Sequence, residues 1–504
     1  FYIISAGICL NYCVFCAAAI LRQFKKRAAI CLNYCNFTLF FGSFMKKNDV
    51  IISTASGYGS EGEAVFVCEG SPVFVPFCIE GERAEVKILS VKGSVAYGKC
   101  ERLLVPSPLR AQPACPLFTK CGGCQLQHMQ YGAQLSFKTQ LVKNTLKKIA
   151  GIEAEVRPAV ASAHTYRYRN KLVLPVGAAG EVGFYAPRSH RIVAAEDCPI
   201  QSEWCAKIIQ IVKAYMASNG LTGYDEAARR GDIRRLAVRE VGGRFIVVLV
   251  AAKKVNCTPL AKMLSQALGE VTLLLNINRS QGNAIFGEEW HTAYGPGFFE
   301  AEDMGIKFRA GANTFLQVND GVRTELYERI VAEASGHSVA IDLYSGGGML
   351  TAMLAKKCGA AYGIEIVKEA SICADELKEL NGLSGSMFNI CGRVEDELSA
   401  VFAKTSGSER VVVCDPPRKG MERSVVEAIK ECGADKLILV SCNPATLARD
   451  LGILLGSLKE EGGILKKTPY YAATSAYKID YIQPYDMFPQ TKHVETLVVL
   501  SKVK

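Results

Sequence analysis

The sequence predicts a multidomain protein with a small all-β barrel, an α+β middle domain and a C-terminal doubly wound α/β domain. From about Val50 to Arg110, short apolar runs are broken by glycines at regular intervals. Residues 155–310 mix strand-like and helix-like patterns, and from about Gly311 onward apolar strands alternate with helices. We therefore expect domains at residues 45–110, 111–310 and 311–504.

Length and composition agree with three domains. The chain has 504 residues, 49% hydrophobic and 21% charged, which is typical of soluble globular proteins. Its net charge of +10 suits a polyanionic partner, although so small an excess on a long chain is often only solvated surface. The 20 cysteines are spread along the chain, which favours a reducing cytoplasm with metal or catalytic roles over disulfides.

The first 44 residues form a separate case. The first methionine is Met45, and ICLNYC at residues 8–13 recurs at residues 30–35. Residues 1–21 are long and uncharged enough for a membrane helix or a signal segment. We prefer an over-extended reading frame, with residues 1–44 absent from a soluble native protein that starts at Met45. N-terminal sequencing of the endogenous protein tests this prediction.

Four cysteines have the spacing of a metal site. Cys115, Cys121 and Cys124 are followed 74 residues later by Cys198. The glycines at 122 and 123 let the backbone fold round an ion, and four thiolates suit either zinc or an iron–sulfur cluster. Between these cysteines lies an amphipathic helix, from about Met129 to Ala150, whose lysines at 138, 143, 147 and 148 we expect to be solvated.

A glycine-rich loop marks a nucleotide-like cofactor site. The segment VAIDLYSGGGMLT at residues 339–351 is an apolar strand that ends in glycines and opens a helix, and Glu365 ends the next strand. Either a dinucleotide or S-adenosylmethionine fits this geometry. The dinucleotide pattern is broken because Thr351 replaces its third glycine. Asp342 before the glycines, with Asp415-Pro416-Pro417 downstream, instead resembles S-adenosylmethionine-dependent methyltransferases.

Cys442 is the candidate nucleophile. It stands where the strand at 436–440 ends and a helix begins, and the helix dipole at that position favours the reactive thiolate. A cysteine there is more often a buried, inert thiol. Two further segments favour a nucleophile instead: VVVCDPPR at residues 411–418 and HVETL at residues 493–497.

Together these three segments resemble the RNA (uracil-5-)-methyltransferases. The resemblance implies a C-terminal S-adenosylmethionine-dependent methyltransferase domain in which Cys442 attacks C6 of a uridine and Glu495 removes the C5 proton. It also places Gln317, within FLQVN at residues 315–319, near the cofactor. The implied cofactor contacts are Gln317, Tyr344, Glu365 and Asp415.

Further resemblances indicate the type of member. Residues 63–67, 75–82 and 105–108 resemble a TRAM domain, an RNA-binding OB-like barrel. Ribosomal members of the family carry a [4Fe-4S] cluster on this cysteine spacing, which implies the ligands Cys115, Cys121, Cys124 and Cys198. We therefore expect methylation of a uridine in 23S ribosomal RNA, in the cytoplasm, without a membrane or an obligate protein partner.

Three alternatives remain. The same chemistry can act on uridine-54 of transfer RNA. A catalytically silent RNA-binding module is a second alternative, although such a protein has no need for Cys442, Glu495 and Gln317 together. A membrane-anchored protein is the third, and it depends entirely on residues 1–44.

Overall fold

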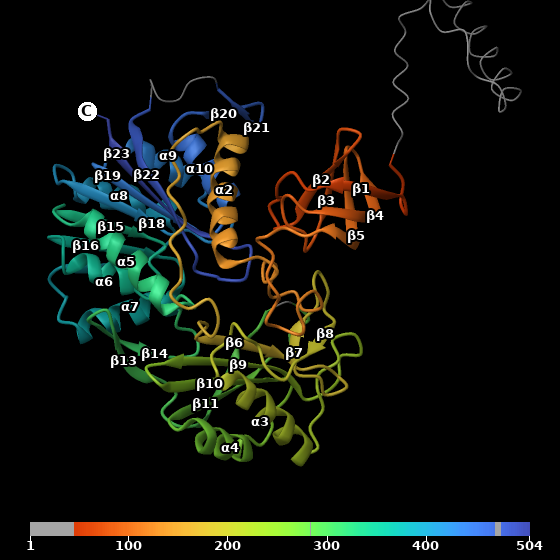
Figure 1. The fold of residues 1–504 in the computed structure, drawn as a ribbon. Helices are drawn as coiled ribbons and strands as arrows, with labels where there is room; N and C mark the ends of the chain where they lie inside the picture. Colours follow the sequence, from red (N-terminus) through yellow and green to blue (C-terminus); the bar gives the residue numbers. More distant parts are fainter. Residues whose placement is uncertain (1–44, 283, 469–474, 504) are drawn as a thin grey trace, which may run out of the picture. The chain divides into compact units, whose positions relative to one another are not determined.

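The structure is a computed structural model that describes residues 45–282, 284–468 and 475–503 (Figure 1). The predictions for residues 1–44 lie outside these residues. In the part that is described, no helix combines the length and the apolar character needed to cross a bilayer.

The N-terminal described segment is a five-stranded, all-β sheet in the order β1-β4-β5-β3-β2. Its edge strands approach each other, because Ser53 Oγ donates a hydrogen bond to the carbonyl of Val67 over 3.1 Å. Alternate residues point inward, and Phe66, Val86 and Ile88 form the core. The strands are β1 Val50–Thr54, β2 Ala64–Cys68, β3 Ser71–Val75, β4 Arg83–Lys92 and β5 Val95–Val105.

The middle part is a five-stranded sheet in the order β12-β11-β10-β9-β6, with α3 and α4 in contact with each other. β10 reads as an unbroken apolar run, since Val247 and Leu249 pack with α3 and α4 while Ile246 and Val248 pack on the opposite side. Its elements are β6 Lys171–Pro175, β7 Gly183–Tyr185, β8 Ile192–Ala194, α3 Trp204–Ser218, β9 Ile233–Val241, β10 Arg244–Ala251, α4 Thr258–Leu268, β11 Val271–Ile277 and β12 Glu289–Tyr294.

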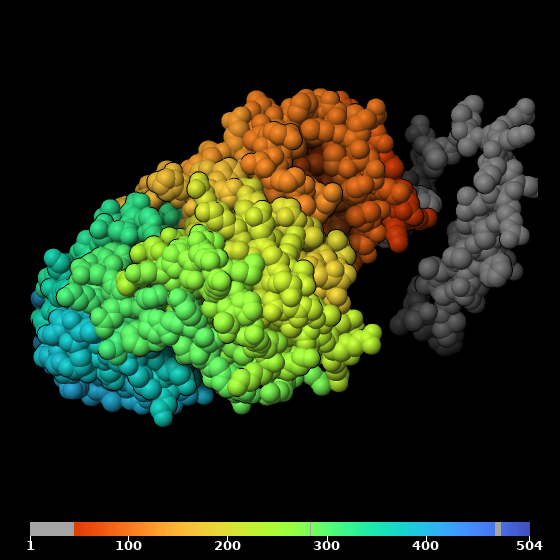
Figure 2. All heavy atoms as spheres, turned by 90° about the horizontal axis from the view of Figure 1, so that it is seen from below, coloured from red at the N-terminus to blue at the C-terminus, as the bar shows by residue number. Residues whose placement is uncertain are grey.

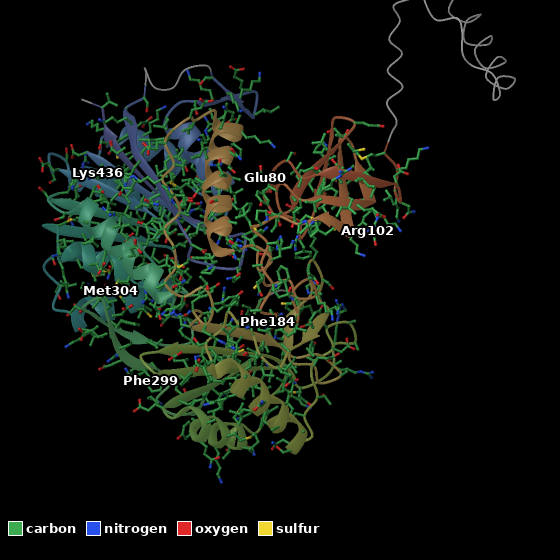
Figure 3. The ribbon with its side chains drawn as sticks, viewed as in Figure 1. Glu80, Arg102, Phe184, Phe299, Met304 and Lys436 are labelled. Carbon is green, nitrogen blue, oxygen red and sulfur yellow. The ribbon has the colours of Figure 1, made fainter. Side chains whose placement is uncertain are left out.

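A hairpin of β13 Phe299–Asp303 and β14 Ile306–Ala310 follows. Phe299 and Met304, labelled in Figure 3, pack against a core that contains residues of both the middle and the C-terminal sheets. Figure 2 shows the yellow and green middle residues meeting the green and blue C-terminal ones on one face. The two sheets therefore share a hydrophobic core.

The C-terminal part confirms the predicted doubly wound α/β fold. Its sheet has the order β17-β16-β15-β18-β19-β23-β22. The strands up to β19 are parallel, β23 is antiparallel to β19, and β22 is antiparallel to β23. The strand order reverses between β15 and β18, which is where such sheets bind ligands beyond the carboxyl ends of their strands. The strands are β15 Val339–Leu343, β16 Ala360–Glu365, β17 Met387–Cys391, β18 Arg410–Cys414, β19 Lys436–Ser441, β22 Tyr477–Tyr485 and β23 Glu495–Lys502, beside a separate hairpin of β20 Leu458–Glu461 and β21 Ile464–Lys467.

Helices cover both faces of this sheet. On β18, Val411 and Val413 face the core that includes α5, α6 and α7, whereas Val412 and Cys414 face the core that includes α8, α9 and α10. The helices are α5 Asp320–Ala334, α6 Met349–Ala355, α7 Lys368–Leu380, α8 Val394–Lys404, α9 Arg423–Glu431 and α10 Pro444–Leu454.

Helix α2, Tyr131–Ala150, belongs to the second of these cores, although the sequence prediction assigns it to the middle domain. Its Val142 and Leu146 are buried there, and the helix packs against α10 (Figure 1). The prediction that Lys138 is solvated is wrong: it is fully buried and forms an ion pair with Asp486.

Candidate active site and four-cysteine cavity

A cavity of about 910 Å³ lies at the carboxyl ends of the C-terminal strands. It is lined by Cys442, which follows β19, by Glu495, which begins β23, and by Asp415, which follows β18. The predicted cofactor contacts Gln317 and Tyr344 line the same cavity. The fold therefore brings together five of the six residues predicted for catalysis and cofactor binding.

Local capping holds Cys442 in its turn. Asn443 is the N-cap of α10, its Oδ1 accepting a hydrogen bond from the N–H of Ala445 over 3.1 Å, and Pro444 occupies the first helical position. Asn443 Nδ2 also donates to the carbonyl of Arg418 over 3.0 Å. The cysteine turn and the loop after β18 are thus fastened together.

The loop after β18 is anchored a second time through Gly420, whose φ of 78° is unfavourable for other residues. A Cβ there would stand 2.5 Å from Arg449 Nη2 and 2.6 Å from Asp450 Oδ2. Arg449 donates to the carbonyls of Lys419 and Met421, at 3.1 and 2.9 Å. Close backbone packing against α10 therefore positions Asp415 and Arg418 beside Cys442.

The surroundings of Cys442 differ from the expectation that its thiolate is favoured. Burial raises the pKa of the Cys442 thiol above its usual value, and the charges of Glu495 and Asp415 raise it further. The Arg418 guanidinium opposes both by lowering that pKa. Burial in the tertiary fold therefore opposes the effect that the helix N-terminus is expected to have on the Cys442 thiol.

Three buried carboxyl groups surround the cavity floor. Burial raises the pKa of Glu495 well above its usual range, with the Asp415 charge adding to the effect, and Glu495 Oε1 has no hydrogen-bond partner within the described residues. Burial also raises the pKa values of Asp415 and of Asp342 to about 7. Carboxyl groups poised near neutral pH are suited to proton transfer.

The loop after β15 is shaped as a cradle. Gly348 has a φ of 81°, and a Cβ there would lie 2.8 Å from the Cβ of Ala374, so packing requires a glycine. A Cβ on Gly346 or Gly347 would instead meet nothing within 4 Å. Tyr344 adopts a φ of 64°, a strained value for a tyrosine. The backbone at 346–347 is thereby left accessible to a ligand.

Glu365 is the one predicted contact that does not line the cavity. It ends β16, and its carboxylate accepts hydrogen bonds from the N–H groups of Gly346, over 2.9 Å, and Val367, over 2.7 Å. It thus supports the glycine cradle directly. Its role as a direct cofactor contact stays a prediction.

Sequence reasoning missed most of the aromatic wall of the cavity. Tyr344 was predicted as a cofactor contact, and Phe315, which is 65% exposed, had a local signal because it adjoins Gln317 in FLQVN. The others come from segments far apart in the chain. The aromatic lining residues are Trp290, Phe308, Phe315, Tyr327, Tyr344 and Phe488.

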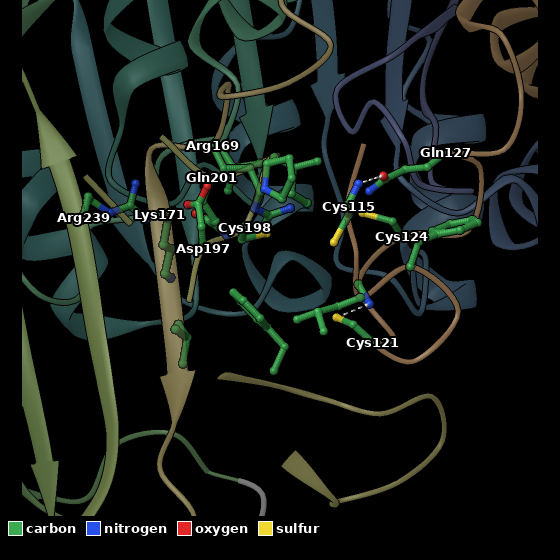
Figure 4. A pocket seen from close by; sticks show the side chains of 18 of the residues that line it. Cys115, Cys121, Cys124, Gln127, Arg169, Lys171, Asp197, Cys198, Gln201 and Arg239 are labelled. Atoms are coloured by element: carbon green, nitrogen blue, oxygen red, sulfur yellow. Dashed lines mark hydrogen bonds between the residues drawn. The ribbon is translucent and has the colours of Figure 1, made fainter. Parts of the chain in front are cut away.

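The four predicted metal-binding cysteines line a second cavity, of about 420 Å³ (Figure 4). Gly123 N–H donates to Cys121 Sγ over 3.3 Å, and Cys115 N–H donates to Gln127 Oε1 over 3.1 Å. A Cβ on Gly122 would stand 3.2 Å from the backbone of Pro187, which explains the small residue there. Phe315, Leu316 and Val318 line both cavities.

The four cysteines are close enough to influence one another. Burial raises the pKa of Cys124 to about 12, and the other three thiols raise it further, so the four sulfurs lie within electrostatic reach of one another. Within the described residues, however, no three Cys, His, Asp or Glu side chains converge on one ion. A metal centre at these cysteines therefore stays a prediction.

The fold and the cavity define the class of protein. A seven-stranded doubly wound sheet with a glycine cradle at its switch point is the fold of the Rossmann-like S-adenosylmethionine-dependent methyltransferases. The family model described as tRNA (Uracil-5-)-methyltransferase matches residues 130–503. The chain belongs to this family, which confirms the predicted family, and it is an RNA methyltransferase.

Relatives agree with this assignment. An uncharacterized RNA methyltransferase of Clostridium tetani is 37% identical over 471 residues, covering 91% of this chain and 97% of its own. One from Halalkalibacterium halodurans is 35% identical and covers 91% and 98%. Among solved structures, the Pyrococcus abyssi tRNA (uracil-54, C5)-methyltransferase in complex with S-adenosyl-L-homocysteine has a TM-score of 0.69 at 23% identity, covering 89% of this chain and 99% of its own.

Proposed function

We propose that this RNA methyltransferase transfers a methyl group from S-adenosylmethionine to C5 of a uridine in 23S ribosomal RNA through a covalent Cys442 adduct. The observation that carries the proposal is that one cavity unites a cysteine at a helix start, a buried carboxyl group and a glycine cradle. The cysteine spacing and the barrel-like segment, which resemble the ribosomal members, support 23S RNA.

Uracil C5 is too weakly nucleophilic to attack a methyl sulfonium unaided. The Cys442 thiolate adds to C6, and the electron pair displaced from the C5–C6 double bond makes C5 electron-rich. Arg418 favours the thiolate at the moment of attack, since its charge lowers the pKa of the thiol. When bound, S-adenosylmethionine supplies the electrophilic methyl group that C5 accepts.

Glu495 then completes the reaction. Its carboxylate removes the proton from C5, and the returning electron pair restores the C5–C6 double bond and expels the Cys442 sulfur. A buried carboxyl group with a raised pKa holds that proton readily. The target uridine must leave its stack to reach this cavity, and the aromatic wall is suited to receive a base.

Four residues would hold the methyl donor. Gln317 and Tyr344 line the cavity, Glu365 supports the cradle, and the carboxylate of Asp415 lies beside both the cavity and Cys442. Asp342, Asp415 and Glu495 line the cavity that would receive the positively charged sulfonium of the donor. The electrostatics of the cavity thus complement the charge of the donor.

Cys115, Cys121, Cys124 and Cys198 would hold a [4Fe-4S] cluster, which with four cysteine ligands supplies a structural centre and no open iron. The contacts of the cysteine loop support such a role. The N–H groups of Gln125 and Leu126 donate to the carbonyl of Gln490, over 3.1 and 3.0 Å, five residues before Glu495. We extend the proposal to residues 45–110 as a TRAM barrel, 111–310 as the middle domain and 311–504 as the catalytic domain, in a cytoplasmic protein.

Methylation of uridine-54 in transfer RNA is the second candidate. It is supported by the description of the family model and by the printed name of the Pyrococcus abyssi structure. The two candidates share Cys442 and Glu495 and differ only in the RNA.

Methyl transfer from labelled S-adenosylmethionine separates them. Unmodified 23S, 16S and transfer RNA are assayed separately, with the Cys442→Ala variant as control. We expect label in 23S RNA that disappears with the variant. Label in transfer RNA alone would establish the second candidate, and label that survives in Cys442→Ala would overturn the mechanism.

A further inference from the structure

Two positively charged residues are neighbours on adjacent strands of the middle sheet. Lys171 of β6 and Arg239 of β9 are direct partners in the antiparallel register. Like charges at such positions destabilise a sheet. Arg169 precedes Lys171 by two residues, and all three side chains line the cavity of the four cysteines. We call these three residues the cation cluster.

The cation cluster lacks a counter-charge. Within the described residues, none of its three members forms an ion pair with a carboxylate. Asp197, in the same cavity, is paired with Arg167. Asp320, the carboxylate that acts most strongly on Arg239, is paired with Arg323 and accepts a hydrogen bond from Asn170.

Burial makes an unpaired charge on these side chains energetically costly. Arg239 is only 5% exposed, and its guanidinium donates to the carbonyl of Leu316 over 3.3 Å. Burial lowers the pKa of Arg239 to about 10. It lowers the pKa of Lys171 to about 8, with Arg239 and then Arg169 adding repulsion. A fold that keeps such charges together without a partner is arranged for an anion.

The position of the cation cluster indicates which anion it binds. Figure 4 shows the cation cluster and Cys198 on one side of the cavity and Cys115, Cys121 and Cys124 on the other. The charges that act on Lys171 are those of the two arginines, whereas those acting on Cys124 are other thiols. Phe315, Leu316 and Val318 line both this cavity and the catalytic cavity, so the cation cluster lies in a cavity adjacent to the one that would hold the uridine.

We propose that Arg169, Lys171 and Arg239 bind a backbone phosphate of the RNA strand that flanks the uridine inserted into the Cys442 cavity. Guanidinium and ammonium groups are the usual partners of phosphate oxygens, and a desolvated site strengthens each bond. The inference rests on the proposed RNA substrate, but not on the chemistry at Cys442 or on a bound cluster.

Binding of a short, fluorescent, single-stranded oligouridylate to the full chain tests the site. We expect Lys171→Gln and Arg239→Gln each to weaken binding by about 10- to 100-fold, the loss of one charge-assisted contact. The slope of log affinity against log salt should fall by about 0.7, the value for one phosphate of a single strand. Lys143→Gln, which removes an exposed lysine of α2, is the matched control and should change little.

Thermal unfolding supplies a readout that a purely structural role would not give. Lys171→Gln relieves the repulsion with Arg239, so the ligand-free variant should unfold at the same or a higher temperature than the parent. A methylphosphonate, which is neutral, placed at each linkage in turn should weaken binding by the parent at one linkage. The same substitution should have little further effect on Lys171→Gln, because the partner charge is already gone.

Unchanged affinity and salt slope in both variants would overturn the proposal. A loss of affinity that appears only together with lost iron and a lower unfolding temperature would also overturn it, by making the cation cluster the counter-charge of a metal centre. Because binding is read without methyl transfer, an enzyme inactive on every RNA would refute the proposed function and leave this result standing.

Discussion

Asp342 carries an electrostatic cost that the Asp342→Asn variant should remove. The residue lies one position before the end of β15 and is 2% exposed. Burial raises the pKa of its carboxyl group from 3.8 to about 7. A hydrogen bond from Thr351 Oγ1, at 2.6 Å, works against this shift, whereas the charges of Asp415 and Glu365 add to it.

The raised pKa of Asp342 predicts the direction and the magnitude of a change in the free energy of unfolding with pH. Between pH 3.8 and about 7 the native protein keeps a proton on Asp342 that the unfolded chain has released, so the free energy of unfolding falls as the pH rises. Below this window both states are protonated and the group contributes nothing. Above about pH 7 the ionised Asp342 lowers the free energy of unfolding by about 4 kcal/mol, at roughly 1.4 kcal/mol per pKa unit. Asparagine cannot ionise, and its amide oxygen still accepts from Thr351.

Urea unfolding followed by circular dichroism, at several values between about pH 5 and pH 8, measures this cost. We expect the stability of Asp342→Asn relative to the parent to rise by about 2.5 kcal/mol across this range, because part of the cost is already present at pH 5. Glu302→Gln, which removes an exposed carboxylate of β13, is the control for the loss of one charge. A difference between Asp342→Asn and the parent that does not depend on pH would refute the reasoning.

Three further predictions concern the cavity. Glu495→Gln should lower turnover by about 10²- to 10⁴-fold and let the Cys442–RNA adduct accumulate on denaturing gels, and normal turnover would exclude Glu495 as the base. Gly420→Ala should cost about 2–3 kcal/mol in urea unfolding, because a Cβ at a φ of 78° meets Arg449 Nη2 at 2.5 Å, and an unchanged midpoint would contradict this. Calorimetry should show S-adenosylmethionine gaining affinity over S-adenosylhomocysteine from about pH 6 to pH 8, as Asp415 ionises opposite the sulfonium that only the former carries; a ratio independent of pH would count against it.

The sequence predicted what short segments determine. Cys442 could be placed at a helix start because Asn443 and Pro444 are strong capping signals next to an apolar strand. Asp415 could be placed for a similar reason, since it follows an apolar strand whose carboxyl end lies at the ligand-binding edge of the sheet, whereas Glu495 was indicated only by the resemblance of HVETL to the family. Local pattern and the family resemblance together predicted the residues that the fold gathers in one cavity.

Properties that arise from distant packing were not predictable in this way. The raised pKa of Cys442 depends on burial and on Glu495, and neither is visible in the residues around the cysteine. Lys138 looked like a surface lysine, yet its partner Asp486 lies at the far end of the chain. The opposition of Lys171 and Arg239 exists only in the register of two strands that are not consecutive.

The segment between β22 and β23 connects the proposed active site to the other parts of the chain. It starts at Asp486 beside Lys138 of α2, whose Nζ also donates to the carbonyl of Phe488 over 3.0 Å. Tyr168 of the middle part donates to the carbonyl of Pro489 over 3.1 Å. Since this segment carries Phe488 into the cavity and ends at Glu495, the position of this proposed catalytic carboxyl group depends on the parts of the chain that hold the segment. Damage to the cysteine loop, which holds the same segment, should therefore reach the active site through the backbone, without any chemistry at a metal.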